Sequence, residues 1–578
     1  MPITAALLLF LAVPLQAASK TLAACLANGH CSSKAMVRSG VGQKTLGDLG
    51  VPKLKAFAKD LKNEKIKWPV YRISKDVQVR DFQERKLEIQ ARLSTFGRNR
   101  LMRASTSWRK WRAQRESGRL LQQRKPLSKL DGIPFIVNDE LSASGFTELV
   151  GTNPRDQRNP RRGRPAVEND PVIQALLDAG AILFGTSVLH EYGISPVGYN
   201  AGHQGPLNAF DQTRFTGGSS GGSATGVALG LFPFAIGFDG DGSVRIPASW
   251  SGVVGAIPTF GAVRYDNAET EIFTTLHCGP IAANVADAAI VMSVMANTKN
   301  QGDHFCDKVY RDRFGVPMPE INFAPLHDKD PTFTIGYDTA WVHDSDPEIE
   351  TMFYEDRDWI QQQPGWSIHD NFMTTHWKEQ ALAHTLIIVS EFHRNYKNDK
   401  IEMLEPNTKF FLALGSEIDK EMIDAAERVK KWASEQWMQQ FEHMDAVITP
   451  AMAVPAQHIE DGIDENGLFD ATLVSTMLKY RWPSNLMGFP SVTATVRNNK
   501  DELPIGIQVI CRPFEDGKCL ALAKKIEEHF EGRREHPEQW GGDLEKTSSG
   551  EVNNDVKEMP SVTRLVMAAT SEVEPRVR

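Results

Sequence analysis

The sequence predicts an α/β fold in which helices cover a mostly buried sheet. Two pairs of neighbouring segments support this prediction, each an apolar run at helical spacing followed by a short continuous apolar run: 170–179 with 181–185, and 222–232 with 234–239. Short continuous apolar runs are typical of strands covered on both faces, and their alternation with helices is typical of layered α/β proteins. The chain has 578 residues, of which 41% are hydrophobic, so it can bury a large core.

The order of elements in this region follows from turn and cap signals. A first strand is expected within 130–140, LDGIPFIVNDE, where an apolar run follows a Gly-Ile-Pro turn and ends in polar residues. A helix is expected to begin after Asn169 as its N-cap, to run to Ala179 and to end at Gly180. The next strand, AILFG, begins directly afterwards.

The rest of the chain divides by composition. Residues 1–18 are expected to be a signal peptide, because an apolar stretch is followed by small residues. The protein is therefore expected in the secretory pathway or outside the cell. Its six cysteines are expected to be oxidised there. We expect a helical region over 19–127 and a main domain over 128–540, with a variable insert at about 295–440. Residues 541–578 predict a polar, poorly ordered tail.

Charge and motif content limit the partners. The net charge of −8 argues against a nucleic-acid partner, and we interpret the basic run at 98–119 as a solvated helix face. No later stretch is long and apolar enough for a stable membrane span. The loop at 217–226 lacks the Gly-Lys-Ser/Thr ending of a phosphate-binding loop, and no cysteine spacing fits zinc. We therefore expect no cofactor and no metal; the sequence leaves the oligomeric state open.

Five blocks of the chain resemble the amidase-signature family and occur in that family's order. They are LDGIPFIVND (130–139), DPVIQALLDAGAILFGTSVLHEYG (170–193), GGSSGGSA (217–224), GFDGDGSVRIPASWSGVVGAIPT (237–259) and the stretch at 483–516. The resemblance implies an α/β/α sandwich with a large mixed β-sheet. It also implies a serine hydrolase of amides with a Ser-cisSer-Lys triad.

The resemblance assigns roles to the two glycine-rich segments. Ser243 stands at the position of the nucleophile, and Ser219 at that of the bridging serine that follows a cis peptide bond. In such a triad a neutral lysine takes the proton of the bridging serine, which takes that of the nucleophile. The backbone amides of Gly240, Asp241, Gly242 and Ser243 are expected to hold the oxyanion.

Two residues depart from the family's pattern. Asn138 stands where the motif G-I-P-x-x-V-K-D has its lysine, and a carboxamide can hold the bridging serine by a hydrogen bond but cannot take its proton. Asp241 replaces a glycine of the turn D-x-G-G-S. A carboxylate ~4 Å from a developing oxyanion would oppose it by several kcal/mol at an effective dielectric of ~20. Alternatively, Asp241 points away and caps the turn.

Three further residues are candidates for contact with a substrate. Ser220 and Asp139 each neighbour a residue of the predicted site in sequence. His277, in TLHCGP, either touches the substrate or is a structural histidine.

These departures leave three functions open. We favour an enzyme of small-molecule metabolism that keeps the amidase cavity and uses Asp241, Ser243 and Ser219 for non-hydrolytic acid–base or acyl-transfer chemistry. The first alternative is an atypical amide or ester hydrolase in which another group replaces the lysine. The second is an inactive binding protein, which the retained serines disfavour. Aromatic residues between 295 and 440, among them Trp341 and Phe372, favour an apolar or aromatic small-molecule substrate.

Overall fold

The computed structural model describes most of the predicted main domain. The described residues are 127–131, 133–153, 165–203, 205–265, 273–296, 321–370, 372–399, 404–460, 463, 470–530 and 537. The predicted signal peptide, the helical region before residue 127 with its basic run at 98–119, and the tail at 541–578 lie outside the described residues.

Within the described residues, ten strands form one mixed sheet in the order β2-β1-β3-β5-β4-β9-β10-β8-β6-β7. The strands are β1 (Pro134–Asn138), β2 (Ile182–Ser187), β3 (Phe234–Asp239), β4 (Val254–Ile257), β5 (His277–Ala282), β6 (Phe333–Gly336), β7 (Trp366–His369), β8 (Ala446–Pro450), β9 (Ser491–Asn498) and β10 (Pro504–Cys511). Strand β1 pairs in parallel with β2 and β3, and β6 with β7 and β8, whereas the strands between them pair antiparallel. This confirms the predicted α/β fold with a large mixed sheet.

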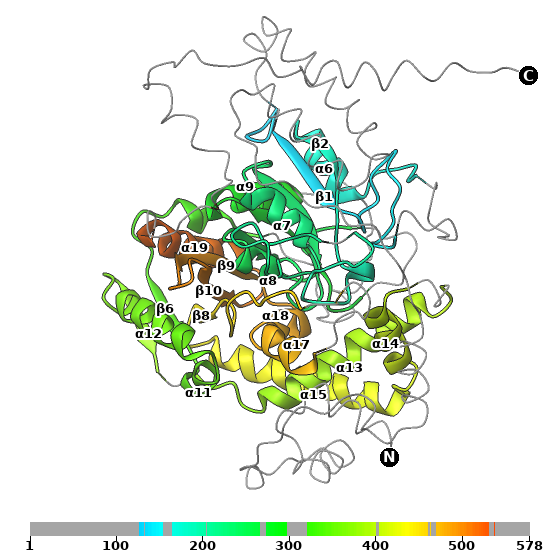
Figure 1. Cartoon of the computed structure of the whole chain (residues 1–578). Coiled ribbons are helices and arrows are strands. Elements are labelled where there is room, and N and C mark those ends of the chain that lie inside the picture. The colour runs from blue at the N-terminus through cyan, green and yellow to red at the C-terminus, as the bar shows by residue number, and fades with distance from the viewer. Residues whose placement is uncertain are drawn as a thin grey trace, which may run out of the picture. The chain divides into compact units, whose positions relative to one another are not determined.

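Helices cover both faces of the sheet (Figure 1). Helices α6 (Pro171–Asp178), α9 (Val285–Met295) and α19 (Asp516–Phe530) pack on one face, and α7 (Gly221–Ala228) and α8 (Arg245–Trp250) pack on the other. The alternation of side chains along the strands accounts for this: Ile136 and Asn138 of β1 face α7, whereas Phe135 and Val137 point the opposite way.

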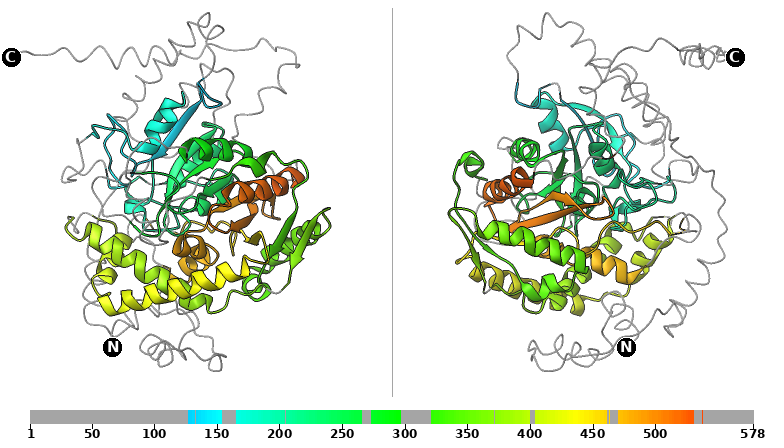
Figure 2. Two further views of the ribbon diagram at one scale, coloured as in Figure 1. Left: turned by 180° about the vertical axis from the view of Figure 1, so that it is seen from behind. Right: turned by 60° about the vertical axis from the view of Figure 1, so that its left-hand side comes forward.

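The remaining helices come mainly from the expected variable insert. They are α11 (Thr339–His343), α12 (Pro347–Gln361), α13 (Trp377–Tyr396), α14 (Pro406–Gly415), α15 (Lys420–Gln440), α17 (Ala471–Leu478) and α18 (Trp482–Met487), with the short 3-10 helices η2 (Glu191–Gly193) and η3 (Ala324–His327). Helix α13 packs against α14, α15 and α18. Seen from behind, α15 (yellow) runs beside α13 (Figure 2). Helices α13, α14 and α15 thus build a helical layer next to α18, whereas Trp359 of α12 packs against His529 and Phe530 of α19.

The predicted elements lie where the sequence placed them, with one correction at a cap. The N-cap of α6 is Asp170 rather than Asn169, because the Asp170 carboxylate accepts a hydrogen bond from the amide of Val172. Asn169 instead accepts from the amide of Ser144.

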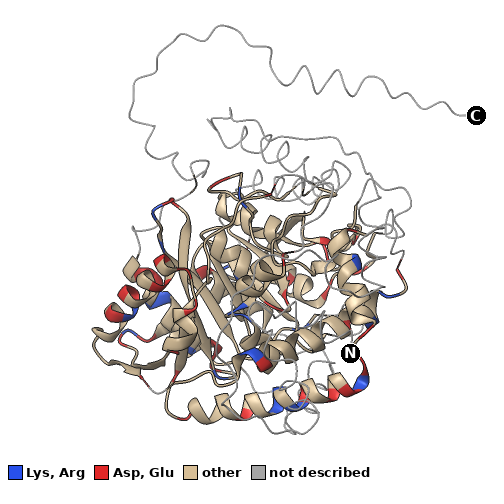
Figure 3. Ribbon diagram, turned by 60° about the horizontal axis from the view of Figure 1, so that its bottom comes forward, with Lys and Arg blue, Asp and Glu red and all other residues tan. Residues whose placement is uncertain are grey.

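Charged side chains lie mostly on the outer helices, and few lie on the sheet (Figure 3). An exception is the fully buried pair Asp239–Arg245, whose nitrogen and oxygen atoms are 3.0 Å apart. In the described part of the chain, no helix combines the length and apolar character needed to cross a membrane.

The expected oxidation is wrong for two of the six cysteines. Cys511 at the end of β10 and Cys519 on α19 are buried neighbours, yet both are thiols. Burial together with the neighbouring Cys519 raises the pKa of Cys511 well above its usual range, which keeps it inert. Cys25, Cys31 and Cys306 lie outside the described residues.

Candidate active site

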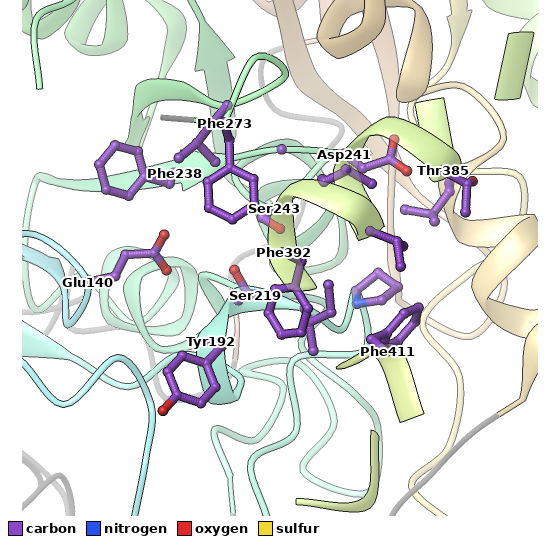
Figure 4. A pocket seen from close by; sticks show the side chains of 18 of the residues that line it. Glu140, Tyr192, Ser219, Phe238, Asp241, Ser243, Phe273, Thr385, Phe392 and Phe411 are labelled. Atoms are coloured by element: carbon purple, nitrogen blue, oxygen red, sulfur yellow. The ribbon is translucent and has the colours of Figure 1, made fainter. Parts of the chain in front are cut away.

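A cavity opens where β1 and β3 end. These strands are parallel, so their carboxyl ends meet at one edge of the sheet, and residues 139–140 and 240–243 follow them there. The cavity holds about 870 Å³ of space including its mouth. Its polar wall contains Ser219, Ser243, Glu140 and Asp241 (Figure 4).

The loop before α7 presents Ser219 to this cavity. The peptide bond between Gly218 and Ser219 is cis, as the resemblance implies. The loop passes so close to Gly198 that a Cβ on that residue would stand 2.0 Å from the carbonyl oxygen of Gly217, so only glycine fits there. Ser219 is 1% exposed and lines the cavity.

The turn that carries Ser243 is built around the Asp239 carboxylate. This carboxylate accepts hydrogen bonds from the amides of Gly242 (2.6 Å) and Val244 (3.1 Å), and from the Arg245 guanidinium. Burial alone would raise the pKa of Asp239, but the Arg245 charge and these hydrogen bonds hold it well below its usual range. Asp239 therefore stays ionised and fixes the turn.

Three of the four predicted oxyanion donors are not used in internal hydrogen bonds. Among the described residues, the amides of Gly240, Asp241 and Ser243 have no hydrogen-bond partner in the protein. The Gly242 amide donates to the Asp239 carboxylate, which removes it from the predicted donors. The turn can therefore offer the amides of Gly240, Asp241 and Ser243 to a bound oxyanion.

Asn138 does not hold the bridging serine. Its amide nitrogen donates to Ser220 Oγ at 2.8 Å, and its carbonyl oxygen accepts from Ser223 Oγ at 2.9 Å and from Ser187 Oγ at 3.5 Å. Asn138 and Ser220 are both fully buried, and neither is among the residues that line the cavity. The structure thus corrects two expectations: the partner of Asn138 is Ser220 instead of Ser219, and Ser220 does not face a substrate.

The other two predicted contact residues also lie outside the cavity wall. The Asp139 carboxylate accepts the amides of Leu149 and Gly151, each at 3.4 Å, and so holds the turn that follows β1. His277 is buried, with Nδ1 2.8 Å from the carbonyl oxygen of Pro258 and its ring edge-on to Phe260. His277 therefore follows the structural alternative that the sequence left open.

Asp241 does line the cavity, and a histidine from the insert accompanies it. His384 on α13 is fully buried; its Nε2 lies 2.9 Å from the Gly240 carbonyl and its Nδ1 3.3 Å from Asp241 Oδ2. Because a carbonyl only accepts, Nε2 carries the ring proton and Nδ1 is left as an acceptor. Burial lowers the pKa of His384 to about 3 and raises that of Asp241 well above its usual range.

Burial thus favours the uncharged forms of both Asp241 and His384. The Nε2–H group of His384 donates to the Gly240 carbonyl, whereas Nδ1 makes no hydrogen bond within the described part of the chain, although Asp241 Oδ2 lies 3.3 Å away. Because burial disfavours the charged carboxylate, it reduces the expected repulsion between Asp241 and an oxyanion. Asp241 lines the cavity, so the alternative in which it points away and caps the turn is wrong.

Glu140 is the second carboxyl group at the serines. Its carboxyl group points from the end of β1 toward Ser219 and Ser243 (Figure 4). Burial, followed by the nearby Glu148 and Asp139, raises the pKa of Glu140 to about 8. Among the described residues, Glu140 Oε2 has no hydrogen-bond partner.

The rest of the wall is mainly apolar. Its large side chains are Tyr192, Ile194, Phe238, Phe273, Leu276, Ile388, Val389, Phe392, Tyr396, Phe411, Val474 and Leu478. Helices α13 and α14 of the insert contribute several of them, but Trp341 and Phe372 do not line the cavity. These two residues pack in the core, Trp341 against Tyr480 and Trp482, and Phe372 against Trp437. The insert shapes the cavity with different aromatic residues from those expected.

The sequence could have revealed Glu140 but not His384. Glu140 ends the block LDGIPFIVNDE, so a polar side chain at the carboxyl end of a buried strand was visible there. His384 lies on a helix 144 residues after Gly240, and no local pattern connects the two. In the described part of the chain, no group of His, Cys, Asp and Glu side chains is arranged to hold a metal ion.

Comparisons with known proteins agree with this architecture. The family model described as Amidase matches residues 98–520. A fatty acid amide hydrolase of Oryza sativa subsp. indica is 29% identical over 427 residues, which cover 73% of this chain and 68% of the relative. A glutamyl-tRNA(Gln) amidotransferase component of Methanosarcina mazei is 26% identical over 465 residues, covering 73% of this chain and 90% of that protein.

A solved structure extends the comparison. It is from a vestigial protein complex said to reveal the evolutionary origins of an s-triazine catabolic enzyme. It matches with a TM-score of 0.64 and 26% identity, over 78% of this chain and 95% of its own.

Proposed function

The chain belongs to the amidase family, and from this premise we propose that it is a serine hydrolase of amides or esters with an apolar acyl group. Ser243 is the nucleophile and Ser219 relays its proton. The observation that carries this proposal is that both serines line one cavity whose remaining wall is mainly apolar.

The turn after β3 supports the role of Ser243. Attack of Ser243 Oγ on the acyl carbon forms a C–O bond and places negative charge on the former carbonyl oxygen. The amides of Asp241 and Ser243 can donate to this oxygen. Burial disfavours the charged form of Asp241, so the aspartate in this turn is compatible with hydrolysis.

The apolar wall supports the substrate class. Side chains from α13 and α14, such as Phe392 and Phe411, face the space next to the serines. Burial of an acyl chain there stabilises binding by about 0.8 kcal/mol for each CH₂ group removed from water. The named activity of the rice relative, fatty acid amide hydrolysis, is the same substrate class.

The proton relay ends without a lysine in this proposal. Among the described residues, none of those that line the cavity is a lysine or an arginine. Asn138, at the position that the resemblance gives to the lysine, is engaged with Ser220 and Ser223 and has no basic nitrogen. Proton acceptance at Ser219 therefore falls to a different group.

A second candidate function is acyl transfer from the same acyl-enzyme. Ser219 is almost completely buried and the wall is mainly apolar, which limits the access of water to the acyl-enzyme. An amine or alcohol that enters the cavity would then compete with water as the acceptor.

Long-chain p-nitrophenyl esters and p-nitroanilides test the proposal. We expect release of p-nitrophenol or p-nitroaniline that increases from four-carbon to twelve-carbon acyl groups and is abolished in Ser243→Ala. Ser416→Ala, at the exposed end of α14, is the matched control and should behave as the wild type. Unchanged turnover in Ser243→Ala would contradict the proposal. With added hydroxylamine, a hydroxamate product would favour transfer over hydrolysis.

A further inference from the structure

We propose that Glu140 is the general base of this site and takes the proton of Ser219 through one bridging water. This inference rests on the proposed function, because it supplies the proton acceptor that the Ser243–Ser219 relay requires. It assigns a catalytic role to a residue two positions after Asn138.

The first support is a gap between Glu140 and Ser219 that Gly193 keeps open. A Cβ on Gly193 would stand 3.3 Å from Glu140 Oε2 and 3.4 Å from Ser219 Oγ. Both oxygens therefore border the volume that a side chain at Gly193 would occupy. A water in this gap could accept from Ser219 and donate to Glu140, which is the reach that general-base catalysis needs.

The backbone maintains this gap. Gly193 closes η2 with a φ of +68°, a conformation that side-chain-bearing residues rarely adopt. The preceding Tyr192 also has a positive φ, and its hydroxyl donates to Asp399. The segment is thus held in an unusual conformation that leaves the space beside Ser219 free.

The second support is the unsatisfied carboxyl oxygen. Among the described residues, Glu140 Oε2 has no hydrogen-bond partner, although it is buried. A buried polar atom without a hydrogen-bond partner is destabilising. The carboxyl group points into the cavity (Figure 4). A hydrogen bond from a water or a substrate group in the cavity would satisfy this oxygen.

The third support is the electrostatic environment. The charged groups that act on Glu140 are Glu148 and Asp139, both acidic, and Asp241 lies in the same cavity. Burial, followed by the charges of Glu148 and Asp139, raises the pKa of Glu140 to about 8. A carboxylate with so high a pKa is a much stronger base than an ordinary glutamate, and its basicity is matched to a weakly alkaline pH.

The proton balance is complete with these groups. Ser243 Oγ bonds to the acyl carbon while its proton moves to Ser219, and the Ser219 proton moves through the water to Glu140. The proton then returns by the same route to the leaving amine or alkoxide as its bond to the acyl carbon breaks. A second water attacks the acyl carbon and passes its proton through the same relay to Glu140. As the bond between the acyl carbon and Ser243 Oγ breaks, this proton returns to Oγ, which releases the acid and free Ser243.

The test uses a long-chain alkyl fluorophosphonate, which forms an Oγ–P bond with an activated serine and releases fluoride. We expect the labelling rate of the whole chain at Ser243 to rise as the pH increases through about 8, because the base must be ionised. Glu140→Gln should slow labelling ~10²–10⁴-fold and remove this rise. Glu140→Asp, which keeps a carboxylate, should be faster than Glu140→Gln.

Glu148→Gln is the matched control, because the new carboxamide could still accept the hydrogen bond from Ser142. It removes one acidic neighbour of Glu140 and should move the rise to lower pH while labelling persists. Wild-type rates and pH dependence in a folded Glu140→Gln would overturn the proposal. Loss of labelling in Ser243→Ala together with normal labelling in Glu140→Gln would overturn it and leave the proposed function intact. Persistent labelling in Ser243→Ala would remove the proposed function itself.

Discussion

Two carboxyl groups flank the serines, and their surroundings give them different chemistry. Asp241 lies against His384 and is influenced by the positive charges of Arg245 and Arg481. The charged groups that act on Glu140 are the acids Glu148 and Asp139, and its Oε2 has no hydrogen-bond partner within the described part of the chain. Burial raises the pKa of both Asp241 and Glu140, but Asp241 lies next to a histidine and is acted on by two arginines, whereas Glu140 Oε2 is available to exchange a proton with the cavity.

The comparison shows that the environment of an acid, rather than its distance from the nucleophile in sequence, decides its role. Asp241 is two residues from Ser243 and lies 3.3 Å from Nδ1 of His384, whose Nε2 contacts the Gly240 carbonyl. Glu140 is about a hundred residues away in sequence, yet it lies at the same cavity because β1 and β3 are parallel neighbours.

The turn that carries Asp241 is held by the buried ion pair between Asp239 and Arg245. Removal of Arg245 should therefore have the largest effect on stability. Arg245→Ala leaves the Asp239 carboxylate buried without its partner, and we expect a loss of about 3–5 kcal/mol in the free energy of unfolding. Urea unfolding measures this loss. Lys420→Ala, which removes an exposed ion pair with Asp424, is the control and should leave the unfolding midpoint nearly unchanged. An equal, small effect of both changes would contradict this view of the turn.

The strand end before Glu140 is held by hydrogen bonds between Asn138 and uncharged serine hydroxyls. Removal of Asn138 should therefore have a smaller effect on stability. Asn138→Ala leaves the hydroxyls of Ser220 and Ser223 with fewer partners in a buried site. We expect a loss of about 1–3 kcal/mol in unfolding free energy. Fluorophosphonate labelling of the folded fraction should stay within about tenfold of the wild-type rate, because Asn138 is not in the relay. Labelling that falls as far as in Ser243→Ala would place Asn138 in the relay after all.

Glu140 is also expected to make the stability of the protein depend on pH. Its pKa in the folded protein is about 8, above the usual 4.5, so the folded state retains a proton that the unfolded state has lost between these values. Stability contributed by this group therefore falls as the pH rises from about 4.5 to about 8. Glu140→Gln should remove the fall, and the variant should gain stability over the wild type across this range. Parallel curves of unfolding midpoint against pH would contradict the raised pKa.

Local patterns in the sequence were sufficient for the strand–helix units and for the two serine loops. Apolar runs and glycines fix β1, α6, β2, α7 and β3, and the glycine-rich turns fix Ser219 and Ser243 at the ends of these elements. The family resemblance added the cis peptide bond and the sandwich. The strand–helix units and the serine loops could be predicted because each depends on residues that are close together in the chain.

Side-chain partners across the fold could not be predicted in this way. The hydrogen bond from Asn138 to Ser220 rather than Ser219 depends on which face of β1 lies against α7. Burial favours the uncharged form of Asp241, and the distant helix α13 places His384 next to Asp241 and the Gly240 carbonyl. The sequence alone therefore led to the expectation that a charged Asp241 would repel an oxyanion. Burial reduces this repulsion because it disfavours the charged form of Asp241.

Labelling of Ser243 by the alkyl fluorophosphonate in Glu140→Gln and Asp241→Asn, side by side, tests the assignment of the two acids most directly. The carboxamide introduced by Asp241→Asn could still donate to His384 Nδ1, so we expect this variant to label within about tenfold of the wild type, and Glu140→Gln to label ~10²–10⁴-fold more slowly. Both variants are neutral amides of nearly unchanged size, so a difference between them reports proton transfer. The reverse result, with slow labelling in Asp241→Asn and near wild-type labelling in Glu140→Gln, would identify Asp241 as the base and contradict the role proposed for Glu140.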